Sequence, residues 1–418
     1  MSVAARDGVQ GLTRVMAAAV IAGIVGGAAP GVAQAQMAVR GETVYTMAGA
    51  PITDGVVIVT DGRIAEVGPA ASVRIPEGYR VLTAKVVTPG LVDAHSVVGL
   101  AGALATNNDQ DQLERSNPIQ PELRALDAYN AEDKLVGYLR SMGVTTLHTG
   151  HGPGALVSGQ TMVVRTVGDH IGDALVDSAT MVAFTLGQGV TSNFSPRSPG
   201  TRAKGVAMLR EQLVKARDYA RKQQGPEDKR PARDLGLETL ARVLDGTLPA
   251  LITAQRAPDI LAALRLQQEF GFRLVLDGAA DAQLVLPEIV AAKVPVIVHP
   301  TMVRPGGETA NASLETAKAL RDAGVLVALQ SGFEGYVPKT RVVLWEAAVA
   351  AANGLTFDQA LRTITIDAAR VIGQDRRVGS LERGKDGDLA LFDGDPFEFT
   401  THVCAVVLGG RVVSEVCR

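Results

Sequence analysis

The sequence is poor in the residues that most often build disulfide frameworks and metal centres. Its 418 residues include two cysteines, six histidines and one tryptophan. Two cysteines are too few for a disulfide scaffold, and they lie in no metal-finger spacing. With so few histidines, a centre rich in imidazole ligands would need a large share of them to converge on one point.

A strong excess of charge of either sign is also lacking. The chain carries 44 acidic and 41 basic residues, which gives a formal net charge of −3. No strong field therefore draws the protein to nucleic acid or to anionic lipid, and we expect neither partner. The hydrophobic fraction of 46% and the charged fraction of 20% are typical of a globular protein.

Apolar runs of membrane-spanning length are lacking as well. Residues 1–35 have the layout of a secretory signal peptide, in which Arg6 and Arg14 precede an apolar run over 15–25 and a small-residue cleavage site at 33–35. The run is shorter than the roughly 20 residues that a membrane span needs, which favours cleavage over anchoring. The sequence thus predicts a periplasmic protein.

The two cysteines flank a turn signal near the C-terminus. Cys404 and Cys417 lie on either side of Gly409-Gly410. If the strands pair across this turn, both thiols lie on one face of the hairpin, about a diagonal pair apart. An oxidising compartment could join them in a disulfide, and two independent buried thiols are the alternative.

Two different patterns of apolar and polar residues divide the chain into regions. Residues 36–88 and 376–418 show short alternating strands between turn signals, and we expect these two ends to form one composite β-sandwich. Over 89–375, short apolar runs alternate with helical stretches, which is typical of a parallel sheet wrapped by helices. The sequence predicts an α/β fold, a (β/α)8 TIM-type barrel with the small sandwich. The candidate barrel strands are Val86–His95, Val144–Thr149, Met162–Val167, Met181–Leu186, Ala250–Gln255, Arg273–Asp277, Val294–His299 and Val325–Ser331.

Some helices can be predicted from local patterns. Gly205–Arg221 has apolar residues at the three-and-four spacing of a half-buried helix. Thr356 and Gln359 make a capping box for a helix that runs towards Val371. Trp345 lies in an apolar run, and we expect it to be a core residue of its helix.

Two motifs resemble those of the amidohydrolase superfamily. Val87–His95 resembles the first barrel strand of that family, and Gly379–Leu389 resembles its return into the sandwich. Pro121–Ala128, Gly143–Thr146 and Gly324–Leu329 resemble the imidazolonepropionase-like branch. The likeness spans essentially the whole chain after the signal and implies the same barrel and sandwich. Because members of the family often self-associate, it also implies a homodimer.

The resemblance implies one or two divalent metal ions, such as zinc, that activate water for attack on an amide or imine carbon. Such an ion needs several histidine or carboxylate ligands at the carboxyl ends of the strands. This sequence departs from that pattern. His95 remains in the first strand, but Val97 replaces the second histidine of the His-x-His pair. The later ligand positions align with Ala183, Gln255, Gly278 and Gly332.

A relocated site is the alternative, because other polar residues fall near the expected strand ends. Histidines there more often hydrogen-bond to backbone carbonyls, so we expect no metal and no cofactor. Asp93 is expected to be a hydrogen-bonding strand residue, and Arg202 either anchors its loop or binds an anion. The candidate pocket at the barrel mouth comprises His95, His148, His151, His299, Gln255, Asp277 and Ser331.

Two functions follow as hypotheses. The first is a pseudoenzyme, an exported amidohydrolase-like barrel that binds a small molecule or supports a partner subunit such as an intact relative. The second is an active hydrolase of carbon–nitrogen, non-peptide bonds in small or cyclic amides, with a rearranged site at His95, His148 and His299. Fold alone does not fix function, and the sequence names neither ligand nor partner.

Overall fold

The computed structural model describes residues 36–104, 106–332 and 342–417. The predicted signal peptide, residues 1–35, lies outside this range. The strands are β1 Met37–Val44, β2 Ile52–Thr60, β3 Arg63–Pro69, β4 Arg80–Pro89, β5 Leu91–Ser96, β6 Val144–Thr149, β7 Val157–Gln160, β8 Met162–Arg165, β9 Leu175–Asp177, β10 Val182–Thr185, β11 Ala250–Ala254, β12 Leu274–Gly278, β13 Val296–Val298, β14 Val327–Ala328, β15 Leu389–Phe392, β16 Val403–Leu408 and β17 Arg411–Ser414. The α-helices are α1 Lys134–Ser141, α2 Ile171–Ala174, α3 Gln188–Phe194, α4 Arg202–Gln223, α5 Leu235–Leu244, α6 Ala257–Phe270, α7 Leu286–Ala292, α8 Thr316–Asp322, α9 Val343–Ala352, α10 Phe357–Thr363 and α11 Ile366–Val371.

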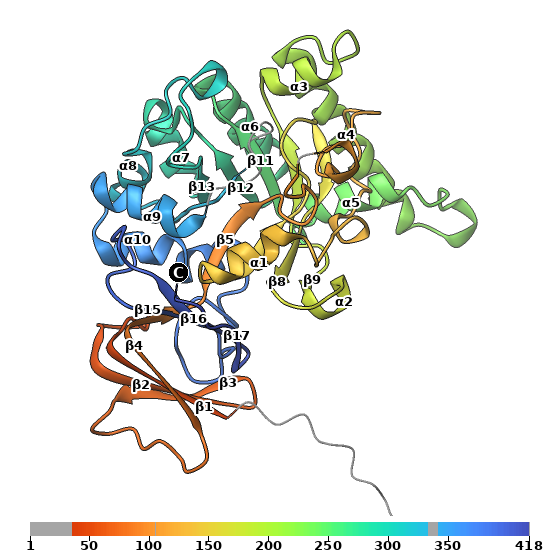
Figure 1. Cartoon of the computed structure of the whole chain (residues 1–418). Helices are drawn as coiled ribbons and strands as arrows, with labels where there is room; N and C mark the ends of the chain where they lie inside the picture. Colours follow the sequence, from red (N-terminus) through yellow and green to blue (C-terminus); the bar gives the residue numbers. More distant parts are fainter. Residues whose placement is uncertain (1–35, 105, 333–341, 418) are drawn as a thin grey trace, which may run out of the picture. The chain divides into compact units, whose positions relative to one another are not determined.

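The first and last strands of the chain share one seven-stranded sheet, in the order β17-β16-β15-β4-β1-β2-β3 (Figure 1). The two ends meet where β15 pairs antiparallel with β4. Inward-facing residues such as Val39, Val57, Val87 and Leu391 form its core. This sheet positions the rest of the fold, because β4 is followed after one residue by β5, the strand that carries His95.

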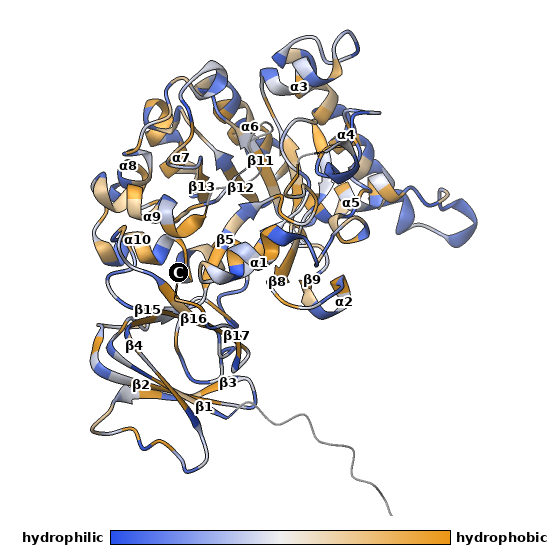
Figure 2. Ribbon diagram, viewed as in Figure 1, coloured by the Kyte–Doolittle hydropathy of each residue, from blue (hydrophilic) through white to orange (hydrophobic). Residues whose placement is uncertain are grey.

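The central residues form mixed α/β sheets. One has six strands in the order β14-β13-β12-β11-β10-β7, and the other has four in the order β5-β6-β8-β9. The neighbours from β10 to β14 are parallel, and their residues are buried because helices cover their outer faces. Figure 2 shows hydrophobic residues concentrated on these strands. The described strands do not make one closed sheet.

The predicted third barrel strand is antiparallel to its neighbours, so the expectation of a parallel strand at Met162–Val167 is wrong. β8 pairs antiparallel with β6, and β7 pairs antiparallel with β10. β7 and β8 are one extended segment that bends at Thr161. Residues 150–161 connect β6 to β8 without a helix, so the chain returns antiparallel beside β6 and makes no parallel crossover.

Two other sequence predictions are corrected near the C-terminal helices. The capping box of Thr356 and Gln359 is present, but the helix ends at Thr363 and a separate α11 follows. The break occurs because strand amides use the helix-end carbonyls: Val92 N donates to Ile364 O and Leu329 N donates to Thr363 O.

Trp345 is 42% exposed and is not a core residue. The buried positions of α9 include Val343, Leu344, Ala347 and Ala350. At about 100° per residue, position 345 lies on the opposite side of the helix from 343 and 347. Because the run is apolar at successive positions, the sequence did not show which of its residues faces solvent.

The terminal hairpin is closed by a disulfide between Cys404 and Cys417. The disulfide alternative therefore describes the structure, and the alternative of two independent buried thiols does not. In the described ranges, no helix is both long and apolar enough to cross a bilayer.

Candidate functional site

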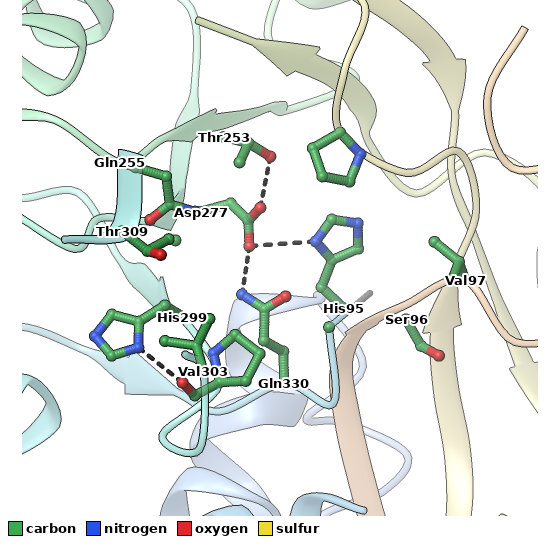
Figure 3. Close-up of a pocket in the computed structure, with 14 residues that line it drawn as sticks. His95, Ser96, Val97, Thr253, Gln255, Asp277, His299, Val303, Thr309 and Gln330 are labelled. Carbon is green, nitrogen blue, oxygen red and sulfur yellow. Dashed lines mark hydrogen bonds and ion pairs between the residues drawn. The ribbon is translucent and has the colours of Figure 1, made fainter. Parts of the chain in front are cut away.

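A cavity of about 140 Å³ lies at the carboxyl ends of the parallel strands (Figure 3). β5 and β12 supply His95 and Asp277, and the residues that follow β11, β13 and β14 supply Gln255, His299 and Gln330. Parallel strands place their carboxyl ends at one edge, so these side chains meet although their positions are far apart in the sequence.

His95 and Asp277 form a buried pair in the wall of this cavity. His95 Nδ1 lies 3.2 Å from Asp277 Oδ1, and both side chains are at most 5% exposed. Nδ1 approaches Asp277 outside ideal hydrogen-bond geometry, and Nε2 has no hydrogen-bond partner among the described residues. Burial lowers the pKa of His95, but the charges of Asp277 and Asp93 outweigh burial and raise it above its usual value.

Asp277 is held in place by two further side chains. Thr253 donates its hydroxyl to Asp277 Oδ2 at 2.6 Å, and Gln330 donates its amide to Asp277 Oδ1 at 2.7 Å. Burial raises the pKa of Asp277, but His95 and these donors outweigh burial, and the net shift is downward. The carboxylate is thus ionised, and both of its oxygens are engaged within the protein.

His148 and His299 are engaged in the same way. His148 donates from Nδ1 to Ala94 O at 2.6 Å, and its Nε2 lies 2.7 Å from Thr161 Oγ1. Burial, with His95 nearby, lowers the pKa of His148 to about 3. His299 donates from Nδ1 to Pro300 O at 2.8 Å, and its Nε2 lies 3.3 Å from Thr316 Oγ1. Neither imidazole offers a free nitrogen to a metal ion.

Three of the predicted residues, His148, His151 and Ser331, lie outside the cavity lining. His151 is buried, and burial lowers its pKa to about 4. Ser331 donates through its hydroxyl and backbone N–H to the carboxylate of Asp93, whose second role is to accept the N–H of His95. Burial raises the pKa of Asp93 to about 6. Asp93 therefore fixes the strand ends beneath the cavity, as the sequence suggested.

The aligned glycines at the later ligand positions are closely surrounded. Gly278 has a φ of +82°, and a Cβ built there would lie 2.3 Å from Gln255 Nε2. Gly332 has a φ of +66°, and its Cβ would lie 2.5 Å from Pro300 Cγ. A side chain at either position would meet an unfavourable backbone conformation. At Gly332 the close neighbour is the rigid ring of Pro300, whereas at Gly278 it is the flexible end of the Gln255 side chain.

Thr253 and Gln330 are cavity residues that the sequence did not single out for the site. Gln330 precedes the predicted Ser331 by one position, and successive residues of a strand face opposite sides. A shift of one residue in the alignment of the last strand therefore exchanges the two. Val97, by contrast, lines the cavity with His95, as the two-residue spacing predicts.

The described residues bring together one potential metal-binding group, Asp393 with Cys404 and Cys417, and its two thiols form the disulfide. His95, His148 and His299 form no such group there. His402 pairs with Asp393 in the terminal sheet, and His170 caps α2. Arg202 pairs with Asp259 and Glu308, so its anchoring role describes the structure.

Known proteins are similar to this chain in sequence and in fold. The profile of the Amidohydrolase family matches residues 207–414. The imidazolonepropionase of Porphyromonas gingivalis is 26% identical over 412 residues, covering 89% of this chain and 90% of that protein. Amidohydrolase tasK of Hapsidospora irregularis is 25% identical over 376 residues, covering 82% of this chain, which spans 38% of that protein's length.

Solved structures give the same picture. An amidohydrolase from Thermotoga maritima superposes with a TM-score of 0.85 at 27% identity, covering 91% of this chain and 100% of that one. An adenosine deaminase from Xanthomonas campestris, solved with bound zinc, has a TM-score of 0.52 at 15% identity, covering 91% and 93% of the two chains. At that identity the second likeness concerns the fold alone.

Proposed function

Because this chain belongs to the amidohydrolase superfamily, with relatives in the imidazolonepropionase-like branch, we propose that it is a metal-independent member whose barrel mouth binds a small polar molecule. We infer that the two central sheets correspond to the (β/α)8-type barrel of the family. The edges of the sheets support this, since Ala94 N donates to Leu329 O and Gly332 N donates to His95 O across the gap between β5 and β14.

The family's divalent metal does not fit the residues at the mouth. A catalytic ion needs about three protein ligands with free lone pairs, and His95 is the one imidazole of the lining with an unpartnered nitrogen. Asp277, His299 and the nearby His148 already use their polar atoms within the protein.

The observation that carries the proposal is the lack of space for a side chain at Gly278 and Gly332. These positions align with a histidine and an aspartate of the family pattern, but Gln255 and Pro300 occupy the volume that such side chains would need. The mouth has therefore been repacked around other residues. What remains is a small cavity in which His95 Nε2 is available to a ligand.

Ligand and activity measurements test this proposal. With and without added zinc, manganese or iron, we expect background hydrolysis of N-acyl amino acids, cyclic amides and small lactones. Binding of fragments of these classes should instead appear as thermal stabilisation, and replacing His95 with Phe, which fills the cavity edge, should remove it. Metal-dependent turnover by the purified protein would overturn the proposal.

A second candidate is an active hydrolase that uses the His95 and Asp277 pair. Asp277 orients the imidazole, and His95 Nε2 is positioned to exchange a proton with a bound molecule. This function predicts turnover of a carbon–nitrogen bond in the presence of a chelator. His95→Ala should abolish that turnover, and Asp277→Asn should reduce it strongly.

Export and assembly complete the proposal. We infer that residues 1–35 direct the protein to the periplasm, and the disulfide of Cys404 and Cys417 supports an oxidising compartment. We also propose that it forms a homodimer or a complex with an intact relative. Proteolytic mapping of the mature N-terminus and light scattering of the purified protein test these two points.

A further inference from the structure

A second cavity, of about 780 Å³, is rich in arginine. Its arginines come from five separate parts of the chain: the start of β3, the last turn of α1, the end of β8, the segment after α11 and the start of β17. They are Arg63, Arg140, Arg165, Arg377 and Arg411.

This arginine cavity lies at the other end of the central strands from the mouth. Arg165, the last residue of β8, pairs with Thr146 near the start of β6, because these two strands are antiparallel. His95 lies near the carboxyl end of β5, which runs parallel to β6. A ligand in the arginine cavity would therefore not compete with one at the mouth.

The positive charge in the arginine cavity is only partly balanced. Asp386 is shared by two guanidinium groups, at 2.5 Å from Arg63 Nη1 and 2.9 Å from Arg377 Nη2. Arg165 pairs with Asp388. Two carboxylates thus serve three arginines.

The remaining two arginines have no carboxylate partner in the described part of the chain. Arg140 Nη1 donates to the backbone carbonyl of Thr166 at 2.8 Å, which leaves its charge uncompensated. The exposed side chain of Arg411 forms no ion pair there. Asp61 and Asp173 also line the cavity, but neither forms an ion pair with any of the five arginines in the described part.

We propose that the arginine cavity binds a small molecule that carries two or more anionic groups, phosphate or carboxylate. Guanidinium groups present planar pairs of N–H donors that match both anions. Convergence of several like charges is unfavourable without a counter-ion, and a polyanion would relieve it. The size of the cavity and the separate origins of its arginines fit a ligand that is contacted from several sides.

Interactions between the sheets alone do not account for the arrangement. The pairs to Asp386 and Asp388 link segments distant in sequence, and this role needs three arginines. This role does not explain Arg411, which forms no ion pair with the residues that the structure describes. Arg411 is therefore the residue whose replacement separates ligand binding from folding.

Calorimetric titration with sodium pyrophosphate and with citrate at low ionic strength tests the proposal. We expect saturable binding of at least one probe with a sub-millimolar Kd, weakened about tenfold or more by Arg411→Ala, the loss of one charge-assisted hydrogen bond. Arg411→Lys should recover part of the affinity. Tighter binding of pyrophosphate would identify a phosphate ligand, and tighter binding of citrate a carboxylate ligand.

The control is Arg74→Ala, which removes an exposed arginine that does not line the cavity. It should leave both titrations unchanged, and circular dichroism should show all variants folded. The proposal would be overturned if neither probe shows saturable binding, or if the Arg74 and Arg411 variants lose affinity equally. His95→Phe should leave these titrations unchanged, because the arginine cavity and the mouth lie at opposite ends of the central strands.

Discussion

The cavity at the barrel mouth and the arginine cavity differ in how their polar groups are satisfied. At the mouth, Asp277, His299 and Gln330 bond to one another or to nearby protein atoms, while Nε2 of His95 has no hydrogen-bond partner among the described residues. In the arginine cavity, two carboxylates serve three guanidinium groups while Arg140 and Arg411 lack a carboxylate in the described residues.

This difference implies that the residues at the mouth contribute mainly to stability and those of the arginine cavity mainly to ligand recognition. Buried groups that satisfy one another make the mouth a rigid part of the core, where a substitution should destabilise the fold. Half-exposed arginines contribute little to stability, so the arginine cavity should tolerate substitution and lose only ligand affinity. Each variant below tests one side of this contrast.

The largest expected effect is that of Gly332→Asp, which introduces a carboxylate at the position that the sequence resemblance aligns with a metal ligand. Gly332 has a φ of +66° and would place its Cβ 2.5 Å from the rigid ring of Pro300. We expect the free energy of unfolding to fall by about 3 kcal/mol or more. Chemical denaturation measures the loss.

Gly271→Asp is the matched control, because Gly271 has a φ of +77° but nothing within 4 Å of a built Cβ. It should lose about 1 kcal/mol from backbone strain alone. Equal losses in the two variants would show that Pro300 does not fill the ligand position, and the argument for a repacked mouth would fail.

The next effect concerns pH. The pKa of His148 is lowered to about 3 by burial, so the unfolded chain binds a proton below pH 6.5 that the folded chain does not. This contribution to the free energy of unfolding is complete above about pH 6.5 and falls by about 2 kcal/mol by pH 4.5. His148→Asn should flatten the stability curve over that range.

Thr161→Val serves as the comparison for His148. It removes the hydroxyl near Nε2 but keeps the imidazole, so stability should fall while the slope with pH remains. If His148→Asn retains the parent slope in denaturation curves from pH 7 to pH 4.5, His148 is not the group that titrates.

A loss of similar or smaller size is expected for Ser331→Ala. Its hydroxyl donates to Asp93, which is buried with a pKa raised to about 6. Removing one donor to a buried carboxylate should lower the free energy of unfolding by about 1–3 kcal/mol at pH 7.5. The control Ser72→Ala removes an exposed hydroxyl bonded to Pro69 O and should change stability by less than about 0.5 kcal/mol.

The smallest effect is expected in the arginine cavity. Arg377 is 41% exposed and shares Asp386 with Arg63. Because Asp386 keeps one partner, Arg377→Ala should change the free energy of unfolding by no more than about 1 kcal/mol. A loss as large as that of Gly332→Asp would remove the distinction between the two cavities.

Local signals in the sequence gave the reliable predictions. Thr356 and Gln359 cap a helix because their contacts are three residues apart, and the apolar spacing of α4 is equally local. The sequence also predicted that Val97 lies on the same side as His95, because residues two apart in a strand face the same side. The strand ends that carry Asp277 and His299 followed from the same patterns.

Features that depend on distant contacts were not readable. The antiparallel course of β7 and β8 depends on contacts of Thr161 with both Met181 and His148. The role of Gln330 depends on a one-residue register that no local pattern fixes, and the partners of His148 and His299 become visible only when the strands are assembled. Whether an imidazole is free or engaged is a tertiary property.

Metal analysis of the protein after exposure to zinc tests the central claim most directly. The protein is incubated with excess zinc, desalted and examined by elemental mass spectrometry beside the His95→Ala variant. The account predicts far less than one equivalent of retained metal in both. Near-stoichiometric zinc in the parent protein that disappears in His95→Ala would contradict it.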